Sequence, residues 1–201
     1  MAVEIVVTTV IVNFFGTMWG RGYALRTNLP IRWFYTGMIF YFITCLQCAF
    51  HTSLTMQKTI HFTDWVPGHA HLVMLGVFAF WCYGMITWLW PRLVGNDWHN
   101  RRLNGWHYWL TMIGLVIMFV DLLAAGVIHG WMLDALAPWM AIVEAMKPYW
   151  SIRTFAGGMI IAGQMCWVYN MWMTARRPKP YDYRVDLVAA PETVAATGKE
   201  A

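Results

Sequence analysis

Two histidines, His69 and His71, stand two residues apart near the start of a long apolar run, in the segment GHAHLVMLG. Successive residues of an α-helix are separated by about 100°, so side chains at i and i+2 point about 200° apart. A regular helix therefore cannot bring both imidazoles onto one metal ion, which needs the i, i+4 spacing. The pair can instead bind two different groups, and two planar metal cofactors on opposite flanks of one helix fit this geometry.

The residues around the two histidines are small. Ala70 lies between them, and Gly68 and Gly76 flank them, which leaves room for bulky planar groups. Polar rings are costly in lipid and usually have a functional reason there. On the residues alone, haem ligation and a pair of core histidines bonded to neighbouring helices both remain open.

The elements that position these histidines are predicted to be transmembrane helices. Of the 201 residues, 59% are hydrophobic and 12% charged, whereas about a quarter of the residues of a soluble domain are charged. A helix of about 20 apolar residues crosses a bilayer, and five stretches qualify: 3–20, 32–54, 66–91, 105–131 and 153–175. The sequence predicts an all-α, polytopic membrane protein, with a five-helix domain at 1–175 and a polar, solvated tail at 176–201.

The distribution of charge predicts the orientation. If the spans alternate, eleven of the fourteen Lys and Arg residues fall on one side, and only Lys58, Lys147 and Arg153 fall on the other. Cytoplasmic loops carry the excess of such residues, so we expect a periplasmic N-terminus and a cytoplasmic C-terminus in a bacterial inner membrane. Because the positive charges lie in loops on one side of the membrane, the net charge of +4 is explained by membrane orientation. No nucleic acid is therefore expected as a partner.

Three further features have plain interpretations. The first 20 residues lack a basic leader region and carry Glu4, so they are predicted to be a permanent helix. The four cysteines fall in apolar runs and are expected to pack there, although Cys45 and Cys48 form a Cys-x-x-Cys, which a redox or metal pair also uses. The connection at 132–151 contains LAPWMAIVEAMKPYW, which predicts a short helix on the membrane surface or a docking surface for an extramembrane subunit.

The run HFTDWVPGHAHLVMLG, in a helix that closes with WPRL, resembles the haem-ligating helix of the haem–copper oxygen reductases. It is most similar to their C family, the cbb-three type of cytochrome c oxidase. The similarity continues in WHYWLTMIG, EAMKPYWSIRTFAGG and VYNMW, and it reaches back to NFFGTMWG near the N-terminus. It covers most of residues 5–175, in the same order.

The resemblance implies roles for both histidines. The family's catalytic subunit has about twelve helices, and this chain resembles the last five. His69 would be the proximal ligand of the high-spin haem, and His71 an axial ligand of the low-spin haem on the opposite flank. Two haems, b-type by the resemblance, are the expected cofactors.

The family's remaining ligands have no counterpart here. The second low-spin ligand and the three histidines that hold copper lie in the family's first seven helices. We therefore expect a separate chain to supply those helices and the copper ligands, with cytochrome c type subunits and the lipid bilayer as further partners. A truncated product or a degenerate paralogue is the alternative.

Secondary sites follow from the same resemblance. His61 would lie near the haem propionates, and Arg153 would pair with one of them or be an ordinary interfacial cation. Thr9, Asn13 and Thr17, at i, i+4 and i+8, form a polar stripe. The resemblance makes this stripe part of a proton route, whereas hydrogen bonding between helices is the alternative.

Two residues depart from the family pattern. Gln47 stands where the family has a glutamate near the high-spin haem, and a glutamine cannot release a proton. Asp121 stands deep in the fourth predicted span, where the family has a small neutral residue. A buried carboxylate is costly and is a functional candidate by default. Asp121 is therefore assigned to the candidate proton route, and Gln47 is assigned to it because of its position.

Three functions are compatible with this pattern. The resemblance favours part of a terminal oxidase that reduces oxygen to water with electrons from cytochrome c. A nitric oxide reductase shares the ligand helix, and a non-catalytic haem-binding subunit for electron transfer needs only the haem ligands. The residues that distinguish them would lie on the partner chain.

Overall fold

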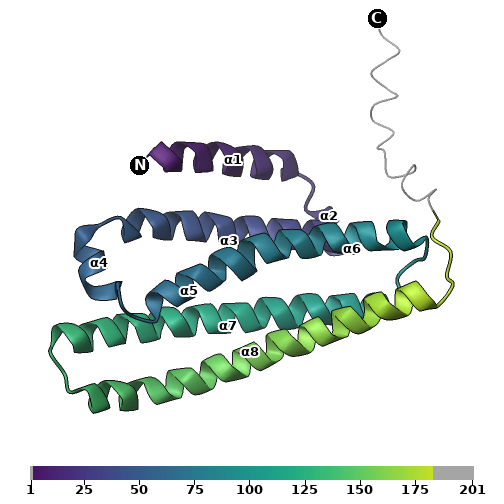
Figure 1. Ribbon diagram of the computed structural model, residues 1–201. Helices are drawn as coiled ribbons and strands as arrows, with labels where there is room; N and C mark the ends of the chain where they lie inside the picture. The colour runs from purple at the N-terminus through teal and green to yellow at the C-terminus, as the bar shows by residue number, and fades with distance from the viewer. Residues whose placement is uncertain (1, 183–201) are drawn as a thin grey trace, which may run out of the picture.

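The structure, a computed structural model, describes residues 2–182, with side chains from residue 5 onward (Figure 1). In chain order the helices are α1 (Ala2–Met18), α2 (Tyr23–Thr27), α3 (Leu29–His51), α4 (Leu54–Ile60), α5 (Trp65–His71), the π-helix η1 (Leu72–Ala79), α6 (Phe80–Val94), α7 (Arg101–Asp134) and α8 (Trp139–Arg176). Within the described range there is no strand, only an isolated bridge between Asn96 and Pro180. The predicted all-α fold is confirmed. The predicted tail begins where α8 ends, and its residues 183–201 lie outside the described range.

Three of the predicted spans are helices long and apolar enough to cross a membrane. They are α3 with 23 residues, the continuous helix Trp65–Val94 with 30, and α7 with 34. The other two predicted spans are also helical. The apolar part of α1, Ile5–Met18, is shorter than a span, whereas α8 has 38 residues and lies antiparallel along α7 over most of its length (Figure 1). The chain is therefore a multi-pass membrane protein.

The connection predicted at 132–151 is different in the structure. Helix α7 continues to Asp134, a short turn follows, and α8 begins at Trp139 and runs on through Pro148. The first turns of α8 contribute Ile142 and Met146 to a small apolar cluster with Ala125 of α7. This packing holds the amphipathic segment as the start of α8, so a separate surface helix is not formed.

Local sequence signals explain several helix boundaries. Asn28 and Asn100 precede α3 and α7, and their side-chain oxygens accept hydrogen bonds from the N–H of Ile31 at 3.1 Å and of Arg102 at 2.9 Å. Both are N-caps, which satisfy donors that a helix start leaves unpaired. Helix α6 ends at Val94, and the residue after it, Gly95, has a φ of 73° in the left-handed region, where glycine is favoured.

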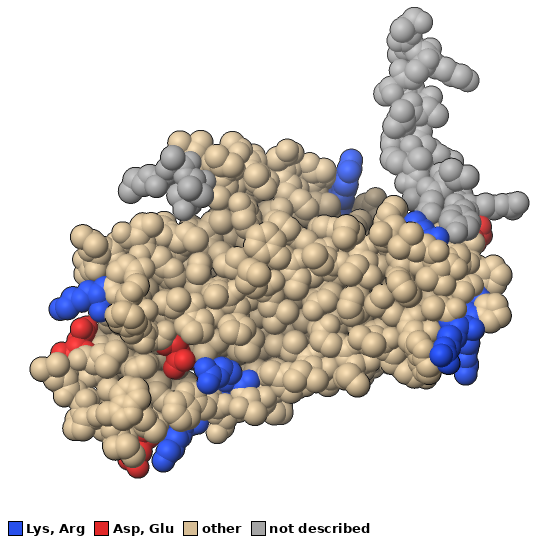
Figure 2. Space-filling model, viewed as in Figure 1, with Lys and Arg blue, Asp and Glu red and all other residues tan. Residues whose placement is uncertain are grey.

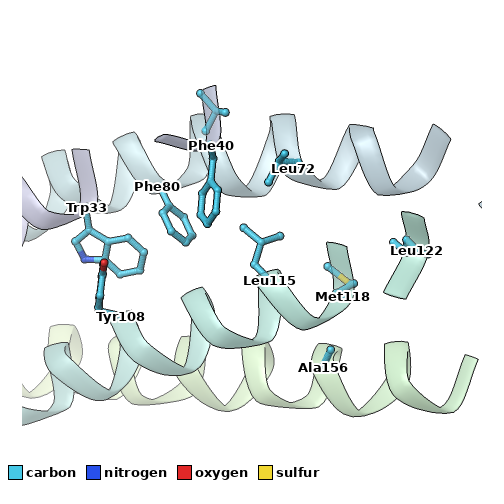
Figure 3. Close-up of a cluster of buried hydrophobic side chains, with 10 residues drawn as sticks. Trp33, Phe40, Leu72, Phe80, Tyr108, Leu115, Met118, Leu122 and Ala156 are labelled. Atoms are coloured by element: carbon cyan, nitrogen blue, oxygen red, sulfur yellow. The ribbon is translucent and has the colours of Figure 1, made fainter. Parts of the chain in front are cut away.

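The helix from Trp65 to Val94 lies between α3 and α7 and forms the centre of the core (Figure 3). Leu72 and Phe80 from this helix are fully buried against Trp33 of α3 and Leu115 of α7. The rings of Phe80 and Trp33 pack edge to face, with 4.7 Å between their centroids. Because these side chains come from three helices, they fix the position of the segment that carries His69 and His71.

Close backbone contact between α5 and α7 depends on Gly126. A Cβ at this position would lie 2.2 Å from the backbone nitrogen of Trp65, the first residue of α5. No side chain fits in that space, so a glycine in α7 sets the distance at which the N-terminal end of α5 sits. One turn further along α7, a Cβ at Gly130 would lie 2.3 Å from the carbonyl oxygen of Thr59, so no side chain fits there either.

At the opposite end of α7, a buried polar cluster joins α8 to the α6–α7 connection. Asn170 is fully buried, and its amide donates to the carbonyl of Asn100 at 2.9 Å and to the side-chain oxygen of Asn104 at 2.7 Å. Its own oxygen accepts from the Asn100 N–H at 3.0 Å. The Thr174 hydroxyl accepts from the N–H of His99. Satisfied polar groups of this kind specify one packing of the two helices.

Asp97 extends this cluster to the segment after α8. Its carboxylate accepts a hydrogen bond from Lys179 at 2.9 Å and pairs with Arg101 at 3.3 Å. Burial pushes the pKa of Asp97 up, but hydrogen bonds from Lys179 and the Trp98 N–H, together with nearby positive charge, outweigh it and hold the pKa below its usual value. The ionised carboxylate therefore contributes to stability at neutral pH.

Charge is segregated along the bundle. On the face in Figure 2, most Lys, Arg, Asp and Glu side chains lie toward the two ends, and a broad central area carries none. One end holds the α1–α3 and α6–α7 connections and the C-terminal end of α8, with nine of the described Lys and Arg residues: Arg21, Arg26, Arg32, Arg92, Arg101, Arg102, Arg176, Arg177 and Lys179. We call it the basic end. Its arrangement agrees with the charge distribution expected from the sequence.

We expect Gly126→Ala to destabilise the chain by about 1–3 kcal/mol, the usual cost of overpacking, because the new methyl group collides with the Trp65 backbone. Thermal unfolding of the purified protein measures the effect. Gly158→Ala is the matched control, since a Cβ there meets nothing within 4 Å. An unchanged unfolding midpoint for Gly126→Ala would contradict the described contact.

Asp97→Asn should lower the free energy of unfolding by about 1 kcal/mol at pH 7. Because the folded-state pKa is depressed, this contribution is complete above the ordinary carboxyl range and is lost as the pH falls below about 4. The difference between wild type and variant should therefore vanish in acid. Glu144→Gln, an exposed change at the other end of the bundle, is the control and should have no effect at either pH.

Candidate functional site

Helix α5 places the two candidate histidines on different sides. Gly68 is buried, and a Cβ there would touch Leu122 of α7 at 3.0 Å, so this part of α5 lies directly on α7. His69 is half-buried on the side of α3, and His71 is exposed. The two rings contact different groups, as the i, i+2 spacing requires.

The ring of His71 is oriented by its own helix. Its Nδ1–H donates to the carbonyl of Pro67 at 2.7 Å. A neutral imidazole carries one N–H, so this bond leaves the lone pair on Nε2. A hydrogen bond from the other ring nitrogen to a backbone carbonyl is the usual support of a metal-binding histidine.

His69 is held by a side chain from α3. The side-chain oxygen of Gln47 lies 3.0 Å from Nδ1 of His69, so the Nδ1–H donates and Nε2 keeps the lone pair. Cys48 Sγ lies 3.8 Å from that Nε2. Gln47 thus orients the ring of His69, as the Pro67 carbonyl orients the ring of His71.

His51 belongs to this site, although its place at the end of a predicted span had not marked it as a candidate. Its ring centroid is 4.4 Å from that of His69, and its Nε2 accepts a hydrogen bond from the indole N–H of Trp65. His51 stands four residues after Gln47, on the same face of α3. That spacing was the signal available in the sequence.

The π-helix η1 follows His71 directly and was not predicted. Such segments insert an extra residue into a helical turn and are frequent at functional sites. Here the register changes between the two histidines and the core residues Leu72 and Val77. Hydrophobic periodicity does not resolve a shift of this size, so no pattern of apolar residues indicated it.

His61 and Arg153 lie near the same end of the bundle as α5. His61 is exposed, and its Nδ1–H donates to the side-chain oxygen of Gln57 at 3.0 Å. Arg153 of α8 is half-buried and pairs with Asp64 at 3.4 Å, directly before α5. This ion pair ties the start of α5 to α8.

The residues assigned to a proton route are spread over separate helices. Thr9, Asn13 and Thr17 lie on α1, where the two threonines are exposed, and their hydroxyls donate to their own helix backbone, to Val6 and Asn13. They share no hydrogen bond with Gln47, which is buried against α5. Within the described part of the chain, the structure does not join them into one path.

Asp121 is 6% exposed in α7. Neither of its carboxyl oxygens has a hydrogen-bond partner among the described residues. The next residue, Leu122, contacts Gly68 of α5, so Asp121 lies toward the end of the bundle that carries α5. The acid predicted from the sequence is therefore buried, and it shares no hydrogen bond with Gln47.

The described residues contain no group of three or more His, Cys, Asp or Glu side chains gathered as a metal site. The site instead offers two separate imidazoles, each with one nitrogen fixed by a hydrogen bond and a lone pair on the other. This arrangement can supply one axial ligand to each of two metal centres.

Comparison with known proteins identifies the family. Residues 1–160 match the family described as Cytochrome C and Quinol oxidase polypeptide I. The bacteroid cytochrome c oxidase subunit 1 homolog of Bradyrhizobium diazoefficiens is 28% identical over 176 residues, which cover 82% of this chain and 32% of that protein. Cbb3-type cytochrome c oxidase subunit CcoN1 of Stutzerimonas stutzeri is 27% identical over 180 residues, which cover 86% of this chain and 38% of that protein.

Two other matches extend the comparison. A nitric oxide reductase subunit of Stutzerimonas stutzeri is 26% identical over 137 residues, covering 64% of this chain and 29% of that protein. A heme-copper terminal oxidase dimer solved by cryo-EM has the same fold, with a TM-score of 0.65 at 16% identity, covering 86% of this chain and 32% of that one.

The chain thus spans about a third of the length of the curated relatives it matches. The family match extends over most of the chain, including the helix that carries His69 and His71. The chain belongs to the cytochrome c and quinol oxidase polypeptide I family, the haem–copper oxidase subunits.

Proposed function

We propose that this chain is the C-terminal, haem-binding part of the catalytic subunit of a respiratory terminal oxidase, and that it acts with a second chain. In this proposal His71 is an axial ligand of a low-spin haem and His69 the proximal ligand of a high-spin haem. The observation that carries the proposal is the pair of oriented imidazoles on opposite flanks of α5, each with its Nδ1–H bonded and its Nε2 unprotonated.

The residues present fit this cofactor. An axial haem ligand is an imidazole that binds iron through one nitrogen, and in both histidines the hydrogen bond at Nδ1 leaves Nε2 for that bond. Ala70 between them is small. On the His69 flank, the ring of His51 must turn aside for a porphyrin to lie against Nε2. A bound haem pair supplies the redox iron for electron transfer and oxygen reduction.

The chain's own residues orient and tune the ligands. The Pro67 carbonyl and the Gln47 side chain each accept an Nδ1–H and so hold the tautomer that exposes Nε2. Gln47 is neutral, so it increases the basicity of His69 less than a carboxylate would. Arg153, bound to Asp64, is the cation that we assign to a haem propionate, and His61 is assigned to the same region.

A separate chain is proposed to carry the remaining helices, the second low-spin ligand and the copper ligands. The exposure of His71 and of Thr9 and Thr17 in the polar stripe supports this. Polar side chains are disfavoured against lipid, so partner helices are the expected cover. The stripe, with Asn13, then takes part in a proton route formed by both chains, with Asp121 as a second candidate acid.

The proposal includes the arrangement in the membrane. Residues 1–175 form the transmembrane domain, the N-terminus is periplasmic, and the basic end and the tail at 176–201 are cytoplasmic. Cytochrome c type subunits are the proposed electron donors. A topology reporter fused after residue 201 should be active only as a cytoplasmic reporter.

Nitric oxide reduction is the second candidate, favoured by the match to a nitric oxide reductase subunit. The two candidates share the ligand helix and differ in the metal site on the partner chain. Consumption of oxygen and of nitric oxide by the purified complex separates them. A complex that consumes neither gas and keeps only six-coordinate haem would instead be an electron-transfer subunit.

We expect His71→Ala to remove the six-coordinate low-spin haem signal and His69→Ala to remove the signal that responds to carbon monoxide. The reason is that each imidazole supplies an axial ligand on its own flank. Reduced-minus-oxidised spectra of the purified complex, with and without carbon monoxide, measure both. His99→Ala, a change at the basic end, is the control, and spectra unchanged in both ligand variants would end the proposal.

Gln47→Leu should weaken binding of the high-spin haem by about 10–100-fold, the usual effect of losing a partner that orients a ligand. It should leave the low-spin haem in place, because the Pro67 carbonyl still orients His71. Haem retention during dialysis against apomyoglobin reports both. Gln164→Leu, which removes a bond to Thr111 at 3.2 Å instead, is the matched control. Equal loss of haem in the two variants would contradict a role for Gln47.

A further inference from the structure

A pocket of about 380 Å³ opens at the basic end, away from His69 and His71. Its walls come from α2, the first turns of α3 and the second turn of α7. They include Arg26, Arg32, Tyr35 and the aromatic pair Tyr108 and Trp109. No acidic residue of the described chain lines it, so the pocket combines two guanidinium groups with aromatic walls.

Arg32 is held in place within the pocket. Its Nε–H donates to the carbonyl of Leu25 at 2.8 Å, and an Nη2–H donates to the carbonyl of Arg26 at 3.1 Å. The guanidinium lies over the ring of Tyr108, 5.5 Å from its centroid. Guanidinium has five N–H donors, so these two bonds leave donors for an acceptor in the pocket.

The floor of the pocket is equally fixed. Tyr108 is buried, and its hydroxyl shares a hydrogen bond of 2.7 Å with that of Thr36. Arg26 is exposed at the rim and adds a second cation. Two arginines around a concave site recognise phosphate groups well, because guanidinium matches phosphate oxygens in a fork-like geometry.

The level of the pocket indicates where such a phosphate comes from. Trp106 and Trp109, on the same part of α7, are 60% and 48% exposed. At the same end, the guanidinium groups of Arg92 and Arg176 lie over the rings of Trp88 and Trp172. Exposed tryptophans beside cations mark the interface between lipid and water, so the pocket opens at the level of the lipid headgroups.

We infer that this pocket binds an anionic phospholipid, with its phosphodiester on Arg26 and Arg32 and an acyl chain along the exposed face of Trp109. Basic pockets between transmembrane helices bind such headgroups. The lipid joins α2, α3 and α7 at the basic end. The inference does not depend on the haem ligands, since His69 and His71 lie toward the opposite end of the bundle.

Native mass spectrometry of the complex purified with this chain tests the inference. Phosphatidylglycerol and phosphatidylcholine with identical acyl chains are added in parallel. We expect a saturable adduct with phosphatidylglycerol only, and about tenfold weaker binding in Arg26→Gln, because this variant loses a charge-assisted hydrogen bond to the phosphodiester. Arg21→Gln, an exposed arginine of the same connection outside the pocket, is the matched control and should bind as wild type does.

Other outcomes would overturn the inference. Equal binding of both lipids would show that the lipid charge plays no role. Equal losses of binding in Arg21→Gln and Arg26→Gln would show a general attraction of the basic end for anionic lipid and no specific pocket. Displacement of the lipid by millimolar inorganic phosphate would assign the pocket to a free anion. Retention of the full adduct in Arg26→Gln and in Arg32→Lys would place the lipid elsewhere on the complex.

Discussion

The angular separation of two imidazoles on a single helix is the constraint on which the molecule depends. Side chains at i and i+2 point to opposite flanks of the helix. His69 and His71 therefore cannot bind the same metal ion, and each contacts different groups. That requires the helix to be held at a fixed depth and rotation. The depth and rotation of the helix are held by the packing of η1 and α6 between α3 and α7, together with the close contact of Gly126 with Trp65.

The two flanks are oriented by different means. On one side a side chain from α3, Gln47, accepts from His69, and on the other the helix's own Pro67 carbonyl accepts from His71. The first depends on tertiary packing, and the second is local. The orientation of His69 is therefore sensitive to the position of α3, whereas His71 is oriented within α5 and is exposed.

Helix positions followed from the apolar stretches, since burial in lipid leaves a strong signal in composition. The separation of His69 and His71 followed from their spacing alone. Other features depend on contacts between distant segments and left no local pattern. The π-helical register of η1 and the continuation of α8 through Pro148 are of this kind. The pairing of Arg153 with Asp64 likewise needed the packed structure. The ring of His51 beside His69 is different, because its spacing from Gln47 is visible in the sequence.

The central claim is that each imidazole binds its own porphyrin iron through Nε2. A cryo-EM map of the complex purified with its partner chains tests this most directly. The account predicts one planar cofactor on each flank of α5, with iron bound to Nε2 of His69 and of His71, and with the Nδ1 contacts to Gln47 and Pro67 retained. A map in which both rings touch only protein would contradict it.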